Sequence, residues 1–127
     1  MAQKALKIFY QNVRGLRTRT DEFFFSILKG DYDVIVLCET WLHEHILDGE
    51  IIDDRYVVYR NDRDQLITKK SRGGGCLIAV KRSIRSRRID EFELGLEDIW
   101  IAINHVDGSK SFFNVRYIDC KSNLATY

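Results

Sequence analysis

The fold is decided by two stretches of the sequence, Tyr10-Gln11-Asn12-Val13-Arg14-Gly15-Leu16 and Val34-Ile35-Val36-Leu37-Cys38-Glu39-Thr40-Trp41. Each is an apolar strand whose last residues bring out an oxygen-bearing side chain, Asn12 in the first and Glu39 in the second. Parallel strands of an α/β domain open their ligand crevice at their carboxyl ends. Because hard divalent cations prefer oxygen ligands, the two side chains are candidates for a Mg²⁺ and phosphate site.

The segment between these two strands predicts a helix. Thr18 and Thr20 are candidate N-cap residues, and apolar residues recur at helical spacing from Phe24 to Leu28, before Gly30. The run from Asp33 to Cys38 is nearly all apolar, which is typical of a strand covered on both faces. Strand, helix and strand over about 30 residues therefore predict a βαβ unit.

Further strands are predicted at Tyr56 to Arg60 and at Cys76 to Val80, after a loop or short helix between His43 and Arg55. The strongest hairpin signal joins Ile99–Ile103 to Phe112–Ile118 through the turn Asp107-Gly108. Antiparallel pairing here, beside parallel pairing in the βαβ unit, predicts a mixed sheet.

The glycine run Gly73-Gly74-Gly75 precedes the strand at Cys76. Glycines of this kind can cradle a phosphate, but no helix with a Gly-Lys-Ser/Thr start follows them. A tight approach of the backbone to its surroundings is the favoured interpretation.

Length and charge bound the class of protein. The chain has 127 residues, of which 45% are hydrophobic, which indicates one modest domain over residues 1–127. The net charge of +1 argues neither for nor against a polyanionic partner. Solvated surface is favoured over phosphate contact for three basic clusters, which are Arg14/Arg17/Arg19, Lys69/Lys70/Arg72 and Lys81/Arg82/Arg85/Arg87/Arg88.

The cysteines indicate a reducing compartment. Cys38, Cys76 and Cys120 are odd in number and far apart, and the first two lie in apolar runs, so reduced, buried thiols are expected rather than disulfides or a zinc site. No apolar stretch approaches the roughly 20 residues of a membrane span. An intracellular location, nuclear or cytoplasmic, is the expectation.

Four segments that follow one another in this order indicate a protein family far more specifically than any one of them does alone. They are Ile8–Leu16, Tyr32–Leu42, Tyr56–Arg63 and Arg72–Val80. Together they closely resemble the amino-terminal half of the endonuclease/exonuclease/phosphatase superfamily domain, in the version carried by non-LTR (LINE-type) retrotransposons. The resemblance runs from about Leu6 to about Tyr117. It implies a four-layer α/β sandwich, related to pancreatic deoxyribonuclease and the abasic-site endonucleases, that hydrolyses phosphodiesters of DNA with Mg²⁺.

The resemblance also implies roles for individual residues. Asn12 would position the attacked phosphate, Glu39 would bind the metal with Asn12 beside it, and Tyr117 would contact the phosphate group. A metal and hydrogen-bond donors are needed because a phosphodiester is negatively charged and repels hydroxide. Trp41 and Trp100 are interpreted as packing residues rather than base-stacking platforms.

Two motifs of the family are missing from this sequence, Gly-Asp-Phe-Asn and Ser-Asp-His, which carry further metal ligands and the general base. His43, His45 and His105 lack that context and are not candidates for the base. We therefore expect an incomplete domain that is inactive as an isolated chain. Two alternatives stay open, a non-catalytic remnant that binds nucleic acid or protein, and the product of a truncated gene model.

Overall fold

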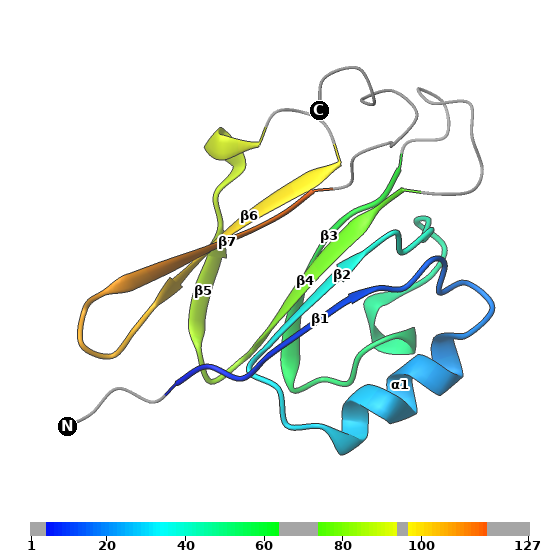
Figure 1. The fold of residues 1–127 in the computed structure, drawn as a ribbon, viewed down its shortest axis with the longest axis horizontal. Coiled ribbons are helices and arrows are strands. Elements are labelled where there is room, and N and C mark those ends of the chain that lie inside the picture. The colour runs from blue at the N-terminus through cyan, green and yellow to red at the C-terminus, as the bar shows by residue number, and fades with distance from the viewer. Residues whose placement is uncertain (1–4, 64–73, 94–96, 117–127) are drawn as a thin grey trace.

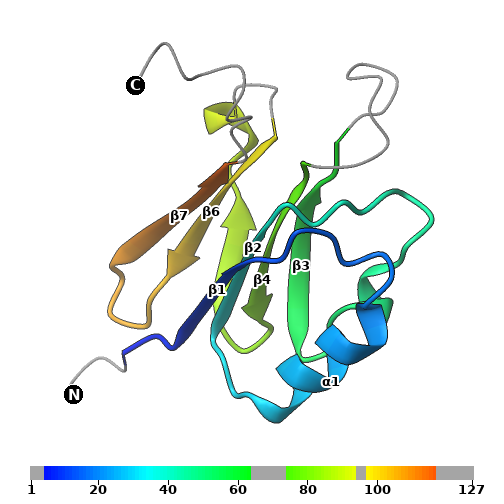
Figure 2. The ribbon, with the colours of Figure 1, turned by 45° about the vertical axis from the view of Figure 1, so that its right-hand side comes forward.

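The computed structural model describes residues 5–63, 74–93 and 97–116. They form three layers, a helix on one sheet and that sheet on a second (Figures 1 and 2). The helix is α1 (Thr20–Lys29). Sheet A has the order β1 (Ile8–Asn12), β2 (Val34–Cys38), β4 (Cys76–Lys81), β3 (Tyr56–Asn61). Sheet B has the order β5 (Arg85–Arg88), β6 (Asp98–Asn104), β7 (Lys110–Arg116). Two short 3₁₀ turns are η1 (Asp48–Glu50) and η2 (Asp90–Phe92).

The βαβ unit is confirmed. β1 and β2 are hydrogen-bonded neighbours in parallel, with Ile8 opposite Val34 and Asn12 opposite Cys38. β4 pairs with β2 and with β3, antiparallel in both cases, which makes sheet A mixed.

Strand β2 is buried on both of its faces, as its apolar sequence predicts. Ile35 and Leu37 pack in the core beneath α1, while Val34, Val36 and Cys38 pack in the core between the two sheets. Successive strand residues point to opposite faces, so a strand between two apolar layers must be apolar at every position.

Two details of the prediction are wrong. The helix N-cap is Arg19, which makes no side-chain capping bond, so neither Thr18 nor Thr20 has that role. The hairpin of β6 and β7 belongs to sheet B, not to the sheet of the βαβ unit, whose mixed character comes from β4 and β3. The alternation of Ile99, Ile101 and Ile103 predicts one buried face but cannot say which sheet supplies the cover.

Strand β5 is absent from the sequence prediction. Its sequence, Arg85-Ser86-Arg87-Arg88, carries no apolar residue. It is a strand because β6 offers it hydrogen-bonding partners, with Arg85 opposite Asn104 and Arg88 opposite Ile101.

The architecture is thus mixed α/β with two stacked sheets. Cys38 and Cys76 are buried, free thiols, as predicted. No helix in the described ranges has the length and apolar character to span a membrane.

Candidate active site at the carboxyl ends of β1 and β2

Asn12 and Glu39 lie at one edge of sheet A. Asn12 is the last residue of β1 and stands opposite Cys38, the last residue of β2, which directly precedes Glu39. Parallel pairing continues past the strands, because the Val13 amide donates to the Cys38 carbonyl at 3.0 Å and the Gly15 amide to the Glu39 carbonyl at 2.8 Å. The structure therefore places the backbones of the two predicted residues at the carboxyl ends of neighbouring strands of sheet A.

The backbone at this edge is strained. Glu39, Trp41 and Arg14 have φ values of 58°, 58° and 50°, and they are the non-glycine residues with positive φ in the described part of the chain. Left-handed φ costs a non-glycine residue of order 1 to 3 kcal/mol, and such residues concentrate at functional sites. All three flank the ends of β1 and β2, so the strain coincides with the candidate site.

Sheet B reaches the same edge through the end of β7. The Cys38 thiol lies 3.7 Å from the carbonyl oxygen of Arg116, the last residue of β7, and can donate a weak hydrogen bond to it. Tyr117 follows Arg116 in sequence but lies outside the described residues. The predicted phosphate contact of Tyr117 therefore stays a prediction.

The glycines before β4 close on the segment after β2. The Trp41 amide donates to the Gly74 carbonyl at 3.0 Å, and the Thr40 amide to the Gly75 carbonyl at 3.3 Å. Both glycines have left-handed φ, 70° and 83°. A Cβ on Gly75 would lie 2.7 Å from the Thr40 hydroxyl oxygen. The predicted tight approach of Gly74 and Gly75 is confirmed; Gly73 lies outside the described residues.

Glu97 and Arg63 belong to this edge, and the sequence prediction missed both. Arg63 Nε donates to Glu97 Oε1 at 2.9 Å, and the Gly75 amide donates to the same oxygen at 3.0 Å. The side chains are only 8% (Arg63) and 21% (Glu97) exposed. The pair thereby ties the glycine loop to the start of β6. No sequence signal joins two residues 34 positions apart, apart from the glycine run that leaves room for them.

The side chains at this edge include oxygen donors of the type that a hard cation prefers, but these donors are few. In the described ranges, the Glu39 carboxylate has no recorded hydrogen bond or ion pair, and it is partly exposed. Burial raises the pKa of the Cys38 and Cys76 thiols, so both stay protonated and are poor metal ligands. No three His, Cys, Asp or Glu side chains of the described residues converge as a metal site. Mg²⁺ tolerates few protein ligands because it keeps several waters and uses substrate phosphate oxygens.

Another buried polar side chain of the described residues is Asp98, at the start of β6. Its carboxylate is fully buried and makes no hydrogen bond. Its recorded ion-pair partner is Arg116, with Nη2 at 3.8 Å, which is beyond hydrogen-bonding distance. Asp98 therefore places a buried carboxyl group next to the end of β7.

The contacts of two of the three histidines place them away from the candidate edge. His105 Nε2 lies 2.6 Å from Ser111 Oγ, beside the hairpin turn and at the other end of β6 and β7 from Arg116 (Figure 1). His45 is exposed, and its Nε2 lies 3.7 Å from the carboxylate of its neighbour Glu44. Neither contact orients a histidine toward Asn12 or Glu39.

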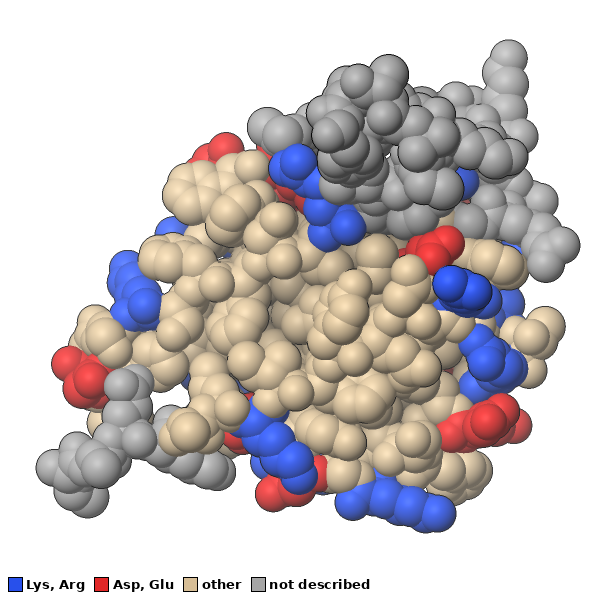
Figure 3. Space-filling view, viewed as in Figure 1, with Lys and Arg blue, Asp and Glu red and all other residues tan. Residues whose placement is uncertain are grey.

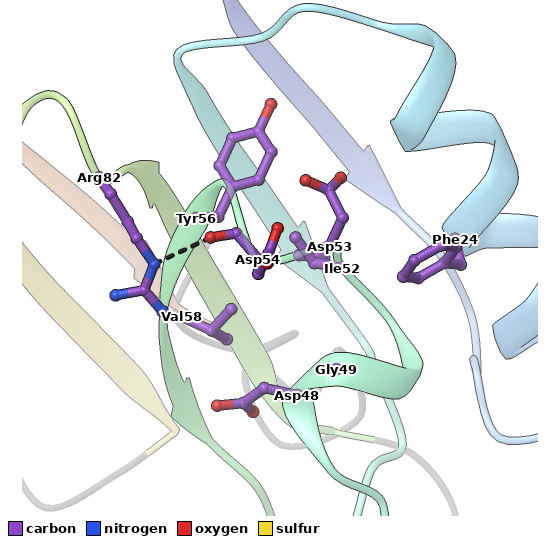
Figure 4. Close-up of a pocket in the computed structure, with 9 residues that line it drawn as sticks. All are labelled: Phe24, Asp48, Gly49, Ile52, Asp53, Asp54, Tyr56, Val58 and Arg82. Carbon is purple, nitrogen blue, oxygen red and sulfur yellow. Dashed lines mark hydrogen bonds between the residues drawn. The ribbon is translucent and has the colours of Figure 1, made fainter.

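A cavity of about 400 Å³ lies elsewhere, between α1, η1 and β3 (Figure 4). Two of its three acidic side chains are engaged by arginines, Asp48 by Arg60 at 3.0 Å and Asp53 by Arg55 at 2.6 Å. Arg82 Nε donates to the main-chain carbonyl of Asp54 at 2.9 Å, the bond drawn in Figure 4. These pairings are structural, and the cavity offers no free nucleophile and base together.

The sequence matches no protein-family model, and no curated protein matches it significantly.

Proposed function

We propose that this chain is a Mg²⁺-dependent phosphodiesterase domain, a DNA-nicking endonuclease of the kind carried by non-LTR retrotransposons. In this proposal the three layers are the amino-terminal half of a four-layer, deoxyribonuclease-like sandwich. The observation that supports it most is that Asn12 ends β1 and that Glu39 directly follows the end of β2, the parallel strand hydrogen-bonded to β1. The strained backbone at Glu39 adds to this support.

Each side chain would have a separate role. Glu39 offers a hard anionic oxygen to Mg²⁺, and Asn12 offers an amide that donates to a phosphate oxygen without exchanging a proton. The bound metal would neutralise charge that develops on the phosphate.

We expect the isolated chain to show little or no cleavage. No general base is identified among the described residues around the edge, and a positioned base is worth about a hundredfold to ten-thousandfold in rate. Metal binding and phosphate binding do not need that base, so they are the more direct readouts of the site.

Titration with Mn²⁺, followed by electron paramagnetic resonance, tests the metal half of the proposal. The native chain should bind Mn²⁺ in competition with Mg²⁺, and Glu39→Gln should lose this binding. Glu22→Gln, which removes an exposed carboxylate from α1, is the matched control and should bind as the native chain does. Unchanged Mn²⁺ affinity in Glu39→Gln would contradict the proposal.

A nicking assay on supercoiled plasmid tests the catalytic half. Any Mg²⁺-dependent nicking should disappear in Glu39→Gln and fall in Asn12→Ala. Nicking that persists in both variants would come from another source and would count against these two residues.

The second candidate function is non-catalytic binding of nucleic acid. It is favoured by Arg14, an exposed arginine with left-handed φ that lies two residues after Asn12 at this edge. DNA binding that is unchanged in the double variant Asn12→Ala/Glu39→Gln, without metal binding in the native chain, would select this candidate.

A further inference from the structure

Two of the three cysteines of the chain stand directly opposite each other in sheet A. Cys38 is the last residue of β2 and Cys76 is the first residue of β4, and the antiparallel register pairs them. These strands are the two central strands of the sheet (Figure 1). No third Cys, His, Asp or Glu of the described residues joins the two thiols to hold a metal ion. A chemical role for the pair must therefore come from the two thiols themselves.

The pair is of the non-hydrogen-bonded kind, in which the two side chains lie closest. Hydrogen-bonded and non-hydrogen-bonded pairs alternate along an antiparallel ladder. The Lys81 amide donates to the opposite Asp33 carbonyl at 3.0 Å, so that pair is hydrogen-bonded. Cys38 lies an odd number of residues beyond Asp33, which gives the other kind of pair. In agreement, the Cys38 carbonyl accepts from the Val13 amide at 3.0 Å, on the side of β2 away from β4.

This geometry is within the range of a disulfide. The Cα atoms of a non-hydrogen-bonded pair are about 4.5 Å apart, and disulfides join Cα atoms separated by about 4.4 to 6.8 Å. Both side chains point to the same face, since both belong to the core between the two sheets. A bond between Cys38 and Cys76 would lie at the short end of the range, so it would be strained and easily reduced.

The two thiols have weak partners in the reduced chain. The Cys38 sulfur lies 3.7 Å from the carbonyl oxygen of Arg116, and the Cys76 sulfur lies 4.0 Å from the carbonyl oxygen of Asn61. A thiol is a weak hydrogen-bond donor. Little hydrogen-bond energy is therefore lost when the two sulfur atoms turn toward each other.

The pair stands where β2 and β4 leave the sheet, at the candidate edge. Just beyond it, the Thr40 amide donates to the Gly75 carbonyl at 3.3 Å, and the Trp41 amide donates to the Gly74 carbonyl at 3.0 Å. Both hydrogen bonds join the segment after β2 to the segment before β4, so they open when the two strand ends separate. A covalent bond at the pair would oppose that separation.

We propose that Cys38 and Cys76 form a reversible disulfide in the presence of peroxide, and that this bond fastens Gly74 and Gly75 to the segment after β2. Cys38 reacts first, because it is 7% exposed whereas Cys76 is 0% exposed. Its S–H bond and the O–O bond of hydrogen peroxide break, and a sulfenic acid and one water form. The Cys76 thiol then attacks the Cys38 sulfur, which forms the S–S bond and releases a second water. In total, two electrons pass from the two sulfur atoms to the peroxide.

The two steps differ in speed. Burial raises the pKa of both thiols, and the first step is slow because the thiolate is the reactive form. The second step is intramolecular, since the register already places the partner opposite. A bond that forms slowly and is easily reduced fits a transient response to sustained oxidation, and not a permanent cross-link.

This disulfide is independent of the proposed endonuclease function. It uses neither the Glu39 carboxylate nor a metal ion, so the result of the Mn²⁺ titration does not bear on it. Conversely, its absence would leave the argument for Glu39 as it stands.

Mass spectrometry of the full chain carrying Cys120→Ser tests the proposal, because Cys38 and Cys76 are then the remaining thiols. The folded protein is treated with hydrogen peroxide, with EDTA present to prevent metal-catalysed oxidation, and is then unfolded and alkylated. We expect a mass loss of about 2 Da without alkylation, and peptide mapping that joins Cys38 to Cys76. Dithiothreitol should restore both thiols to alkylation.

Hydrogen exchange measures the effect on the candidate edge. In the oxidised chain, the amides of Thr40 and Trp41 should exchange at least about tenfold more slowly, because the typical stabilisation by a disulfide exceeds the free energy of a tenfold change. The Gly108 amide is the control, since it bonds to the His105 carbonyl at 3.0 Å in the turn between β6 and β7. Its exchange should not change.

The matched control variants are Cys38→Ala and Cys76→Ala, each in the Cys120→Ser chain. Neither should form an internal disulfide or show slower exchange after peroxide treatment. Circular dichroism checks that both keep the fold.

Three results would overturn the proposal. The first is the formation of disulfide-linked dimers or sulfinic acids in place of an internal bond, which would show that the two thiols do not meet within one chain. The second is an internal bond that forms in urea but not in the folded chain, because the native register would then have no part in it. The third is unchanged exchange at Thr40 and Trp41 in the oxidised chain.

Discussion

At the scale of single residues, the backbone of Glu39 is strained at the place where the candidate site needs its carboxylate. Glu39 has the φ of a left-handed residue although a glycine there would be unstrained. The strand ladder of β2 ends at Cys38, and the left-handed turn at Glu39 departs from the alternation that would otherwise direct its side chain under α1. The strained backbone at Glu39 therefore lowers the stability of the fold, but it gives the carboxylate a defined position at the edge of sheet A.

Glu39→Gly should therefore stabilise the fold while removing metal binding. Removing the left-handed strain stabilises the folded state, and the greater entropy of glycine in the unfolded chain offsets part of this effect. The net increase in the free energy of unfolding is about 0.5 to 1 kcal/mol. Urea denaturation measures it. Gln11→Gly, at an exposed position inside β1 with ordinary φ, is the control and should lose a similar amount. A loss of stability in Glu39→Gly would show that its side chain is structural.

Gly74 is the residue that permits the pair of Arg63 and Glu97. A Cβ there would lie 2.0 Å from Glu97 Oε1 and 2.4 Å from Arg63 Nε, and the φ of 70° adds strain. Gly74→Ala should cost about 2 to 3 kcal/mol of unfolding free energy. Thermal denaturation with Gly49→Ala as control checks this, because a Cβ on Gly49 meets nothing within 4 Å. Equal effects of the two changes would refute the role given to Gly74.

At the scale of elements, the end of α1 is fastened by Arg55. Its guanidinium donates to the carbonyls of Ile27 and Gly30 at 3.4 Å and to the Asp53 carboxylate at 2.6 and 3.0 Å. A cation at a helix C-terminus satisfies carbonyls that the helix leaves open and interacts favourably with its dipole. Arg55 thereby joins α1 to the start of β3.

The stability supplied by Asp53 should depend on pH. The hydrogen bond from Arg55 lowers the pKa of Asp53 below its ordinary value of 3.8, so the charged form is favoured in the folded state. Its contribution is present above pH 3.8 and is lost as pH falls through the folded value. Asp53→Asn should cost about 1 kcal/mol at neutral pH and nothing at the acid end, measured by urea denaturation at each pH. Asp54→Asn, an exposed neighbour, should show no such trend.

The sequence predicts the elements whose cause is local or periodic. The apolar run of β2, the helical spacing of α1 and the Asp107-Gly108 turn each indicate the observed element. Strand β5 could not be predicted, because its four polar residues depend on a free edge of β6.

The same division holds for the candidate site. Asn12 and Glu39 are visible in the sequence because each ends an apolar run, and parallel pairing then places them together. Glu97 and Arg63 come into contact only when Gly75 packs against Glu97 beside the start of β6. No local sequence pattern therefore predicts this pair.

At the scale of the whole molecule, two strands terminate their sheets on one side. β1 ends the order of sheet A and β7 that of sheet B. Figure 3 shows that the centre of the face over these strands carries few charged atoms. Ile8 and Tyr10 of β1 are 48% and 64% exposed. An edge strand with apolar side chains and no charge is a template for pairing with another chain.

Self-association at high concentration should therefore depend on β1. Ile8→Lys places a charge on this edge and should lower the apparent mass by light scattering toward that of a monomer, without changing the midpoint of thermal unfolding. Leu28→Lys, an exposed apolar position of α1, is the control. Equal effects of the two substitutions would indicate general charge repulsion instead of strand pairing.

Strands β2 and β4 separate the helix-side core from the inter-sheet core, and each contributes side chains to both. Because these two strands belong to both cores, we expect the two cores to unfold in one transition and not separately. Damage to the packing under α1 is therefore transmitted, through these two strands, to the inner face of sheet B.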